Sequence, residues 1–144
     1  MERLKKIVVD ASVAVKWFAP EPHYEKALAL REAFLIDQIE MAAPSLIIYE
    51  IANALRFHRI YSFSSEEISN AIRSLLNLKF IKQLRSKAWI KAVLLSMNKD
   101  VSIYDSVYAA LAIDLKATLI TSDKELYKKL GDEVAITLLE NVKM

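Results

Sequence analysis

The chain contains no cysteine and only one glycine among its 144 residues. Without cysteine it can have no disulfide framework, thiolate zinc site, iron–sulfur cluster or cysteine nucleophile. One glycine is too few for either glycine-rich motif that cradles phosphates, G-x-G-x-x-G or G-x-x-x-x-G-K-[ST]. The two histidines, His23 and His58, lie far apart and form no H-E-x-x-H motif. If the protein is an enzyme, carboxylates are therefore its expected catalytic groups.

The charges are almost balanced, with 20 Lys and Arg against 18 Asp and Glu, but they are unevenly distributed. No acidic residue occurs between Glu67 and Asp100, whereas seven Lys or Arg residues do. Such a stretch is by default the solvated face of helices. Its positive charge would also attract a polyanion, and the candidate contacts with a nucleic acid are Lys79, Lys82 and Arg85.

The chain also lacks any apolar run approaching the roughly 18 residues of a membrane span. We therefore expect no membrane partner, and the absence of cysteine fits a cytoplasmic protein. The length suits one domain, and no repeat, linker or low-complexity tract divides it. Residues 1–144 are accordingly expected to form a single domain.

Two short apolar runs, residues 7–9 and 117–121, predict buried strands. Most of the remaining pattern predicts helices, with Ser64 and Glu67 forming a capping box and Ser102 and Asp105 repeating it. Further strands are expected at residues 79–84 and 134–136. The expected helices cover residues 21–36, 45–59, 64–78, 86–97, 102 to about 114, and 123–130, the last of them stopped by Gly131.

Short strands separated by helices predict right-handed crossovers and a parallel sheet covered on both faces, which is an α/β fold. Ligands of such sheets bind beyond the carboxyl ends of the strands, and Asp10 and Asp123 occupy those ends. Each also has a structural explanation. Asp10 could cap a short helix at residues 11–15, and a box formed by Ser122 and Glu125 would place Asp123 in a first helical turn.

Glu50 is harder to explain structurally, because its predicted helical face also carries apolar residues such as Leu46 and Phe57. Glutamate is almost never buried unless it is paired or binds a metal. Asn53, one turn later, adds a polar group. A tilt that exposes this stripe to solvent is the alternative, and we favour a site.

Asp105 begins a segment, residues 103–112, that is apolar around nearly its whole circumference and predicts a central buried helix. The Ser102 cap gives Asp105 a structural reason to exist, although the position also brings a carboxylate close to the sheet. Asp114 lies at the other end of this helix beside Lys116, and we interpret it as structural.

Two of these acids lie at strand ends and two on covering helices, so the predicted topology brings all four to one edge of the sheet. Like charges at such proximity repel unless a cation lies among them. Oxygen ligands without His or Cys favour a hard cation, Mg²⁺ or Mn²⁺. Such a site can activate water for attack on phosphorus. The sequence therefore predicts phosphodiester hydrolysis.

Four segments, in their order and spacing, resemble the PIN-domain nucleases and among them the VapC-type toxin ribonucleases of prokaryotic toxin–antitoxin pairs. They are IVVDASVAVKWF, APSLIIYEIANAL, and YDSVYAALA followed by ATLITSDKEL. Together they span essentially the whole chain. The resemblance implies a three-layer α/β/α sandwich with a short parallel sheet and Mg²⁺- or Mn²⁺-dependent endoribonuclease activity. It also implies a homodimer and a cognate VapB-type antitoxin that blocks the site.

The resemblance implies site residues as well. The family's four acidic positions correspond to Asp10, Glu50, Asp105 and Asp123. Three supporting polar positions correspond to Ser12, Asn53 and Thr121. One position departs from the family: Lys116 stands where many relatives have glycine, so the preceding helix is expected to end without a left-handed residue of that kind.

The remaining conspicuous side chains are given structural interpretations. We expect Trp17, Phe18, Tyr104 and Tyr108 to serve packing rather than base stacking, and His58 to be an exposed bystander on a helix end.

Other functions account for fewer of the residues. A haloacid-dehalogenase-like phosphatase would need a second Asp where Ser12 stands. A receiver domain would need adjacent acids after the first strand and an accepting Asp after the third, and neither is evident. A housekeeping RNA-processing PIN nuclease stays possible. A catalytically silent PIN-fold RNA-binding module would usually have lost one of the acids, and here all four are present.

Overall fold

The computed structural model describes residues 6–143 and has an α/β fold around a four-stranded parallel sheet. The strands β1 (Lys6–Val9), β2 (Glu40–Ala42), β3 (Thr118–Thr121) and β4 (Ile136–Leu138) lie in the order β2-β1-β3-β4. Ile7 pairs with Met41 on one side and with Thr118 on the other. The predicted fold class is confirmed. The expectation of one domain also covered residues 1–5 and 144, which lie outside the described part.

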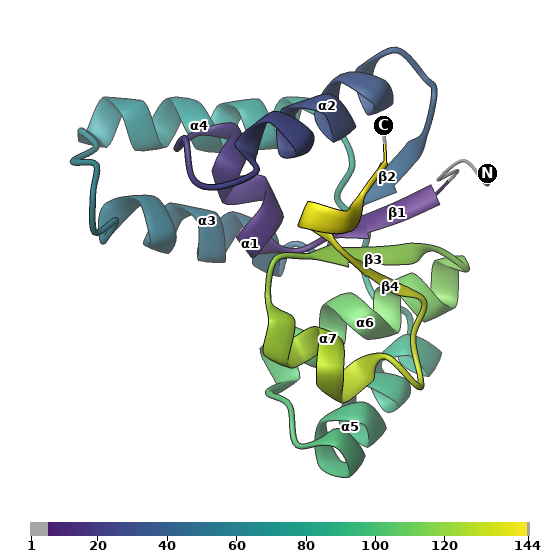
Figure 1. Ribbon diagram of the computed structural model, residues 1–144. Coiled ribbons are helices and arrows are strands. Elements are labelled where there is room, and N and C mark those ends of the chain that lie inside the picture. The colour runs from purple at the N-terminus through teal and green to yellow at the C-terminus, as the bar shows by residue number, and fades with distance from the viewer. Residues whose placement is uncertain (1–5, 144) are drawn as a thin grey trace.

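Helices cover both faces of this sheet. In Figure 1, α1 and α2 lie on one face and α5, α6 and α7 on the other, while α3 and α4 pack together and project beyond the carboxyl ends of the strands. We call this pair the α3–α4 arm. No helix within residues 6–143 is both long enough and apolar enough to cross a bilayer. The helices are α1 (Ala11–Ala14), α2 (Tyr24–Leu35), α3 (Leu46–Arg56), α4 (Ser65–Asn77), α5 (Ser86–Lys99), α6 (Ile103–Leu115) and α7 (Lys124–Leu130), with 3-10 turns η1 (Val15–Trp17) and η2 (Leu139–Asn141).

The core includes residues from helices on both faces of the sheet, and α6 is buried all round, as its apolar sequence predicts. Residues 106–112 are all buried, and α6 packs against β1, β3 and α5. Ile7, Val8 and Val9 are fully buried because they are covered from both sides. A central helix with this much apolar contact fixes the position of its first turn, where Asp105 lies.

Several element boundaries differ from the prediction. The strand β2 was missed, since Glu40-Met41-Ala42 is short and has no β-branched residue. The predicted strand at 79–84 is wrong, because only Ile81 pairs, with Ala43, and Lys79 has a left-handed backbone. The last strand begins at Ile136, two residues later than predicted. Helix α2 begins at Tyr24 after a left-handed His23, and α3 ends at Arg56, three residues before the predicted end.

The helix α6 ends without a left-handed glycine, as expected, but its turn still has a left-handed residue. Lys116 itself adopts this conformation, with φ 55° and ψ 45°. A side chain in the left-handed region is strained where glycine would not be. Gly131 ends α7 with φ −55°, so its conformational freedom is not used there.

Candidate active site

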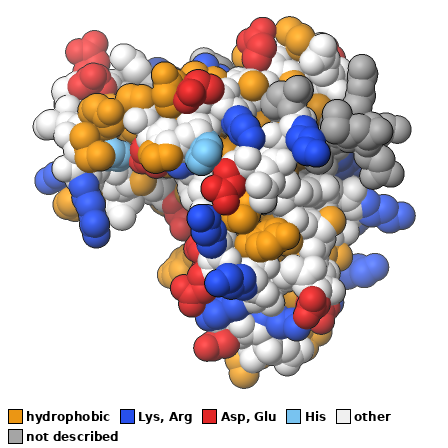
Figure 2. All heavy atoms as spheres, viewed as in Figure 1, with side chains coloured by type: hydrophobic (Ala, Val, Ile, Leu, Met, Phe, Trp, Pro, Cys, Tyr) orange, Lys and Arg blue, Asp and Glu red, His pale blue; other side chains and the backbone are white. Residues whose placement is uncertain are grey.

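The four predicted acids converge at the carboxyl edge of the sheet. Asp10 follows β1 and Asp123 follows the neighbouring β3, while Glu50 lies on α3 and Asp105 in the first turn of α6. The charge of Asp105 raises the pKa of Asp10 and of Glu50, and the charge of Asp123 raises that of Asp105. Asp105 therefore interacts electrostatically with each of the other three acids, and we call the four residues the acidic cluster. Figure 2 shows acidic side chains along the hollowed edge between the α3–α4 arm and the rest of the molecule.

Asp10 is the most enclosed of the four, with 7% of its surface exposed. The Ser12 hydroxyl donates to its Oδ1 at 2.5 Å, and the Thr121 hydroxyl donates to its Oδ2 at 2.5 Å. The backbone N–H of Val13 also donates to Oδ1, so Asp10 caps α1 as well. Burial outweighs these hydrogen bonds and raises the pKa of Asp10 from 3.8 to about 6.

Ser12 and Thr121 join the ends of β1 and β3. Ser12 Oγ accepts from the N–H of Ser122 at 2.9 Å, and Thr121 Oγ1 accepts from that of Asp123 at 3.1 Å. Asp123 caps α7 itself by accepting the Leu126 N–H at 3.0 Å. The prediction that Ser122 caps this helix and puts Asp123 in its first turn is therefore wrong, because the helix begins one residue later.

Asp105 and Asp123 line a hollow of about 160 Å³ between the starts of α6 and α7. The Ser102 hydroxyl accepts the Asp105 N–H at 3.0 Å, as the capping pattern predicted. Burial and then the Asp123 charge raise the pKa of Asp105, and Lys129 opposes that shift. Lys129 Nζ donates to the Asp100 carbonyl at 2.9 Å on the same wall. A cation of this chain therefore already lies at the edge of the acidic cluster.

Glu50 is half-buried and has an unpredicted partner, Tyr108. The Tyr108 hydroxyl donates to Glu50 Oε1 at 2.5 Å across 58 positions of sequence. Burial raises the pKa of Tyr108 well above its usual 10, and the charges of Glu50, Asp10 and Asp105 raise it further, so the hydroxyl keeps its proton. Burial is also the main cause of the raised pKa of Glu50. The interpretation of Tyr108 as packing alone missed this hydroxyl; the available signal was its position one turn after Asp105.

Asn53 lies three residues after Glu50 on α3. It is exposed and lines a hollow between α3 and α4, together with Arg56 and Ser69. Residues three apart on a helix are neighbours on its surface, and a supporting role of Asn53 beside Glu50 stays a prediction.

The three basic candidates lie within residues 79–85 and differ in their contacts. The Arg85 guanidinium binds Asp114 with two hydrogen bonds, Nη2 to Oδ1 at 2.8 Å and Nε to Oδ2 at 3.3 Å. This pair confirms the structural interpretation of Asp114, whose pKa is lowered by the Arg85 hydrogen bond. Lys79 is exposed in the turn after α4, and Lys82 lines a different hollow.

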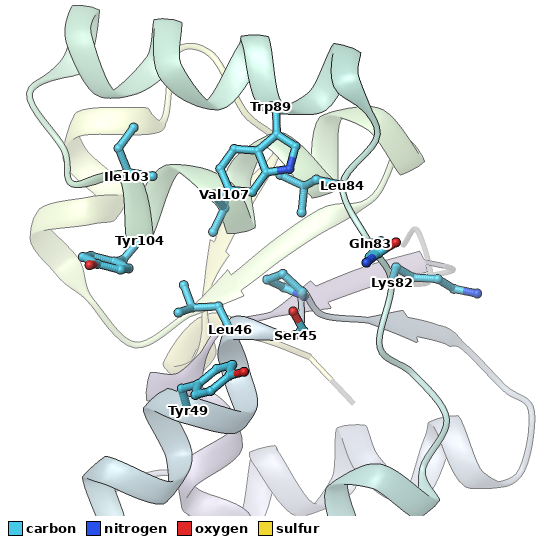
Figure 3. A pocket seen from close by; sticks show the side chains of 11 residues that line it. Ser45, Leu46, Tyr49, Lys82, Gln83, Leu84, Trp89, Ile103, Tyr104 and Val107 are labelled. Atoms are coloured by element: carbon cyan, nitrogen blue, oxygen red, sulfur yellow. The ribbon is translucent and has the colours of Figure 1, made fainter.

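That hollow has a volume of about 440 Å³ and lies between α3, α5 and α6. Figure 3 shows Trp89 of α5 pointing into it above Val107, with Tyr104 from α6 and Tyr49 from α3 on the opposite wall. Tyr49 and Tyr104 are the sequence neighbours of Glu50 and Asp105. An apolar space therefore adjoins the two helices that carry acids of the cluster.

His58 is not an exposed bystander. Its Nε2 lies 2.8 Å from Glu21 Oε2, and its Nδ1 accepts the N–H groups of Ile60 and Tyr61, both at 3.2 Å. The buried Lys16 lies 3.2 Å from the other oxygen of Glu21. These contacts tie the loop after α3 to the segment before α2, which is a structural role.

The donor set of the acidic cluster fits a hard divalent cation. All four groups offer oxygen, and their charges repel one another. Asp10, Glu50 and Asp105 are buried or half-buried, and Asp123 is exposed. Within residues 6–143, no group of three or more Asp, Glu or His side chains is arranged to hold an ion by itself. Mg²⁺ suits such a site, because it is usually held by one or two carboxylates and keeps several waters.

Comparisons with known proteins agree with this geometry. The profile of the PIN domain family matches residues 7–131. Ribonuclease VapC3 of Pyrobaculum aerophilum is 32% identical over 130 residues, covering 86% of this chain and 94% of the relative. The crystal structure of PAE2754 from Pyrobaculum aerophilum has a TM-score of 0.66 at 26% identity, covering 94% of this chain and 92% of that one. VapBC2 from Rickettsia felis, solved bound to a DNA fragment from its promoter, shares the fold, with a TM-score of 0.69, 16% identity and coverage of 92% and 98%.

Proposed function

The chain belongs to the PIN-domain family, and from that premise we propose that it is a metal-dependent endoribonuclease that hydrolyses RNA phosphodiester bonds. The observation that carries the proposal is the convergence of Asp10, Glu50, Asp105 and Asp123 at one edge of the sheet. The 32%-identical relative is named a ribonuclease, which supports RNA as the substrate. We further propose that the chain is one domain and acts in the cytoplasm as the toxin of a toxin–antitoxin pair.

Asp10, Glu50, Asp105 and Asp123 would hold Mg²⁺ or Mn²⁺ between them, one or two as direct ligands and the others through waters that the ion keeps. When bound, such an ion supplies Lewis-acid activation of water and of the phosphate. Ser12 and Thr121 fix both oxygens of Asp10, which holds that carboxylate in one orientation. Lys129, beside the hollow that Asp105 and Asp123 line, offers positive charge to a phosphate of the substrate.

Conservative substitutions separate a metal site from helix capping. Asn caps helices about as well as Asp, so Asp10→Asn, Asp105→Asn, Asp123→Asn and Glu50→Gln should leave the fold intact while removing a charged ligand. We expect each to abolish cleavage of a mixed RNA pool and to gain much less stability from Mg²⁺ or Mn²⁺ than the wild type does. Asp114→Asn is the control and should keep both. Retention of cleavage and of the ion-dependent shift by all four variants would reassign these acids to capping.

A salt titration tests whether Lys79, Lys82 and Arg85 contact RNA. Binding of single strands weakens with salt by a slope near −0.7 per phosphate contact. Replacing all three by Gln should weaken binding of RNA and flatten this slope without changing metal affinity. Because Arg85 is engaged by Asp114, Lys82→Gln alone should have a larger effect on the slope than Arg85→Gln. An unaltered slope in the triple variant would make these residues a solvated face.

A VapB-type antitoxin is the proposed protein partner, and structural relatives solved as toxin–antitoxin complexes support it. We expect a short segment of the antitoxin to place an Arg or Lys among the four acids, where its charge takes the part of the ion. Expression of this chain alone should slow growth, and co-expression of a neighbouring antitoxin gene should restore it. Harmless expression would favour a housekeeping nuclease.

A homodimer is proposed through the outer face of α5. Ile90, Val93, Leu94 and Met97 lie there, each between 48% and 78% exposed, and Trp89 borders them where it lines the hollow between α3, α5 and α6. At 100° per residue they share one sector of the helix with Ser86 and no charged residue, whereas Lys87 and Lys91 lie in the next sector. An uncharged apolar face can meet its own copy without repulsion.

The oligomeric state tests this face. Leu94→Glu should convert a dimer into a monomer in sedimentation experiments, and Lys91→Glu, on the same helix outside the apolar sector, should not. Interfaces of standard size have dissociation constants from about nM to μM. A wild-type protein that is still monomeric at about 50 μM would therefore exclude the dimer.

A further inference from the structure

Tyr108 joins the central helix to the α3–α4 arm through the acidic cluster. Its ring is buried, with 2% of the residue exposed, and its hydroxyl donates to Glu50 Oε1 at 2.5 Å. A buried tyrosine hydroxyl needs a hydrogen-bond partner. Any nearby carbonyl could satisfy the hydrogen bond of a buried hydroxyl. Here the acceptor is one of the four acids, and it lies on a different helix.

We propose that Tyr108 is a positioning residue for the acidic cluster: it holds one oxygen of Glu50 and so fixes that carboxylate at a set distance from Asp105. The inference rests on the proposed metal-dependent function. Tyr108 and Asp105 are three residues apart on α6, so they occupy the same face one turn apart. The hydrogen bond to Tyr108 therefore fixes the position of the Glu50 carboxylate relative to the helix that carries Asp105.

Glu50 needs such a restraint more than the other acids do. Asp10 and Asp123 are held by backbone N–H groups at the starts of helices, and the Ser102 hydroxyl fixes the first turn that carries Asp105. Glu50 lies inside α3, away from any helix start, on a side chain with three rotatable bonds. The negative charge of Asp105 also acts on it. The neutral Tyr108 donor opposes that repulsion without adding a charge that would compete with the cation.

The chain offers a matched control for this tyrosine. Tyr104 lies one turn earlier on α6, with 63% of its surface exposed, and lines the apolar hollow. Tyr108→Phe and Tyr104→Phe each remove one hydroxyl from the same helix. Titration calorimetry of Mn²⁺ into the full-length, EDTA-stripped protein should show affinity 10–100-fold weaker for Tyr108→Phe, the usual cost of losing a residue that orients a ligand, and unchanged for Tyr104→Phe.

Two further measurements separate positioning from a merely structural role. In the Glu50→Gln background, Tyr108→Phe should no longer change Mn²⁺ affinity, because the effect acts through Glu50. Cleavage by Tyr108→Phe at limiting Mn²⁺ should show reduced kcat with unchanged KM for RNA, and excess Mn²⁺ should restore kcat. Glu50→Asp is too short to reach the hydroxyl, so in that background too Tyr108→Phe should cause no further loss of Mn²⁺ affinity.

Mn²⁺ affinity of Tyr108→Phe within twofold of wild type would overturn the proposal, as would an equal loss in the Glu50→Gln background. If the wild type itself binds no Mn²⁺, the proposed function fails. A double-mutant cycle then tests the positioning role, with Tyr108→Phe and Glu50→Gln measured singly and together by the free energy of unfolding without metal. A coupling energy between the two substitutions supports the role, and additive effects reject it.

Discussion

Replacing Asp10 by Asn should make the metal-free protein more stable at neutral pH. The pKa of Asp10 is about 6 in the folded chain, against a reference value of 3.8. The folded state therefore binds this proton more tightly than the unfolded state does. The contribution of Asp10 to stability is fully present below pH 3.8 and is lost as the pH rises through 6.

The magnitude follows from the shift. About two pKa units at 1.36 kcal/mol each give a total loss of about 3 kcal/mol, which begins below pH 3.8 and is complete above pH 6. The amide introduced by Asp10→Asn does not ionise, so the variant avoids this loss. Its amide oxygen can still accept the Val13 N–H, and its amide group can bond the hydroxyls of Ser12 and Thr121 after they rotate. We expect Asp10→Asn to gain about 2 kcal/mol of stability relative to the wild type between pH 4.5 and pH 8, which is most of this total.

Urea unfolding in EDTA, followed by circular dichroism and by tryptophan fluorescence at several pH values, measures this difference. Glu50 and Asp105 also have raised pKa values, but they are present in both proteins and largely cancel. The control is Asp114→Asn: its pKa is lowered, so its contribution is lost only below pH 3.8 and its effect should be constant from pH 4.5 to 8. A constant difference for Asp10→Asn across the same range would refute the reasoning. Saturating Mg²⁺ should remove the advantage of the variant, because only the wild type gains the full binding energy of the ion.

Three further substitutions test other contacts. Thr121→Val should lower the free energy of unfolding by about 1–3 kcal/mol, because the hydroxyl that donates to Asp10 is buried and its partner loses a hydrogen bond; urea unfolding measures it. His58→Ala should cost a similar amount, about 1–3 kcal/mol in thermal unfolding, because Glu21 and two backbone N–H groups lose their partner. Lys116→Gly should stabilise the protein at 25 °C by about 0.5–1 kcal/mol, since relief of about 1–2 kcal/mol of left-handed strain exceeds the added unfolded-state entropy. A destabilised glycine variant would show that Lys116 is not strained.

The parts of the fold that could be predicted depend on local signals. Ser64 and Glu67 form both halves of their capping box, and the apolar residues of α6 are buried all round. Strand ends placed Asp10 and Asp123 at one edge, because parallel topology leaves few alternatives. The cluster of acids was therefore accessible from the sequence, even though each of its members had a structural explanation.

The missed features depend on contacts between distant segments. Tyr108 meets Glu50 across 58 positions, and His58 meets Glu21 across 37. Neither pair has a spacing that a single sequence can reveal. The prediction of a Ser122 cap was wrong for a related reason. The backbone N–H of Ser122, after β3, donates to Ser12 from the other end of the chain, and α7 begins one residue later than predicted.

The scarcity of glycine bears on how stability changes with temperature. Five described residues that are not glycine occupy left-handed turns: His23, Asp37, Lys79, Asp100 and Lys116. Each side chain adds strain that varies little with temperature, and each narrows the conformations open to the unfolded chain, an entropic gain whose free energy grows in proportion to absolute temperature. Compared with turns that contain glycine, such turns therefore make the protein less stable at low temperature, and this difference decreases on heating. The advantage of Lys116→Gly should accordingly shrink as unfolding is measured at higher temperature.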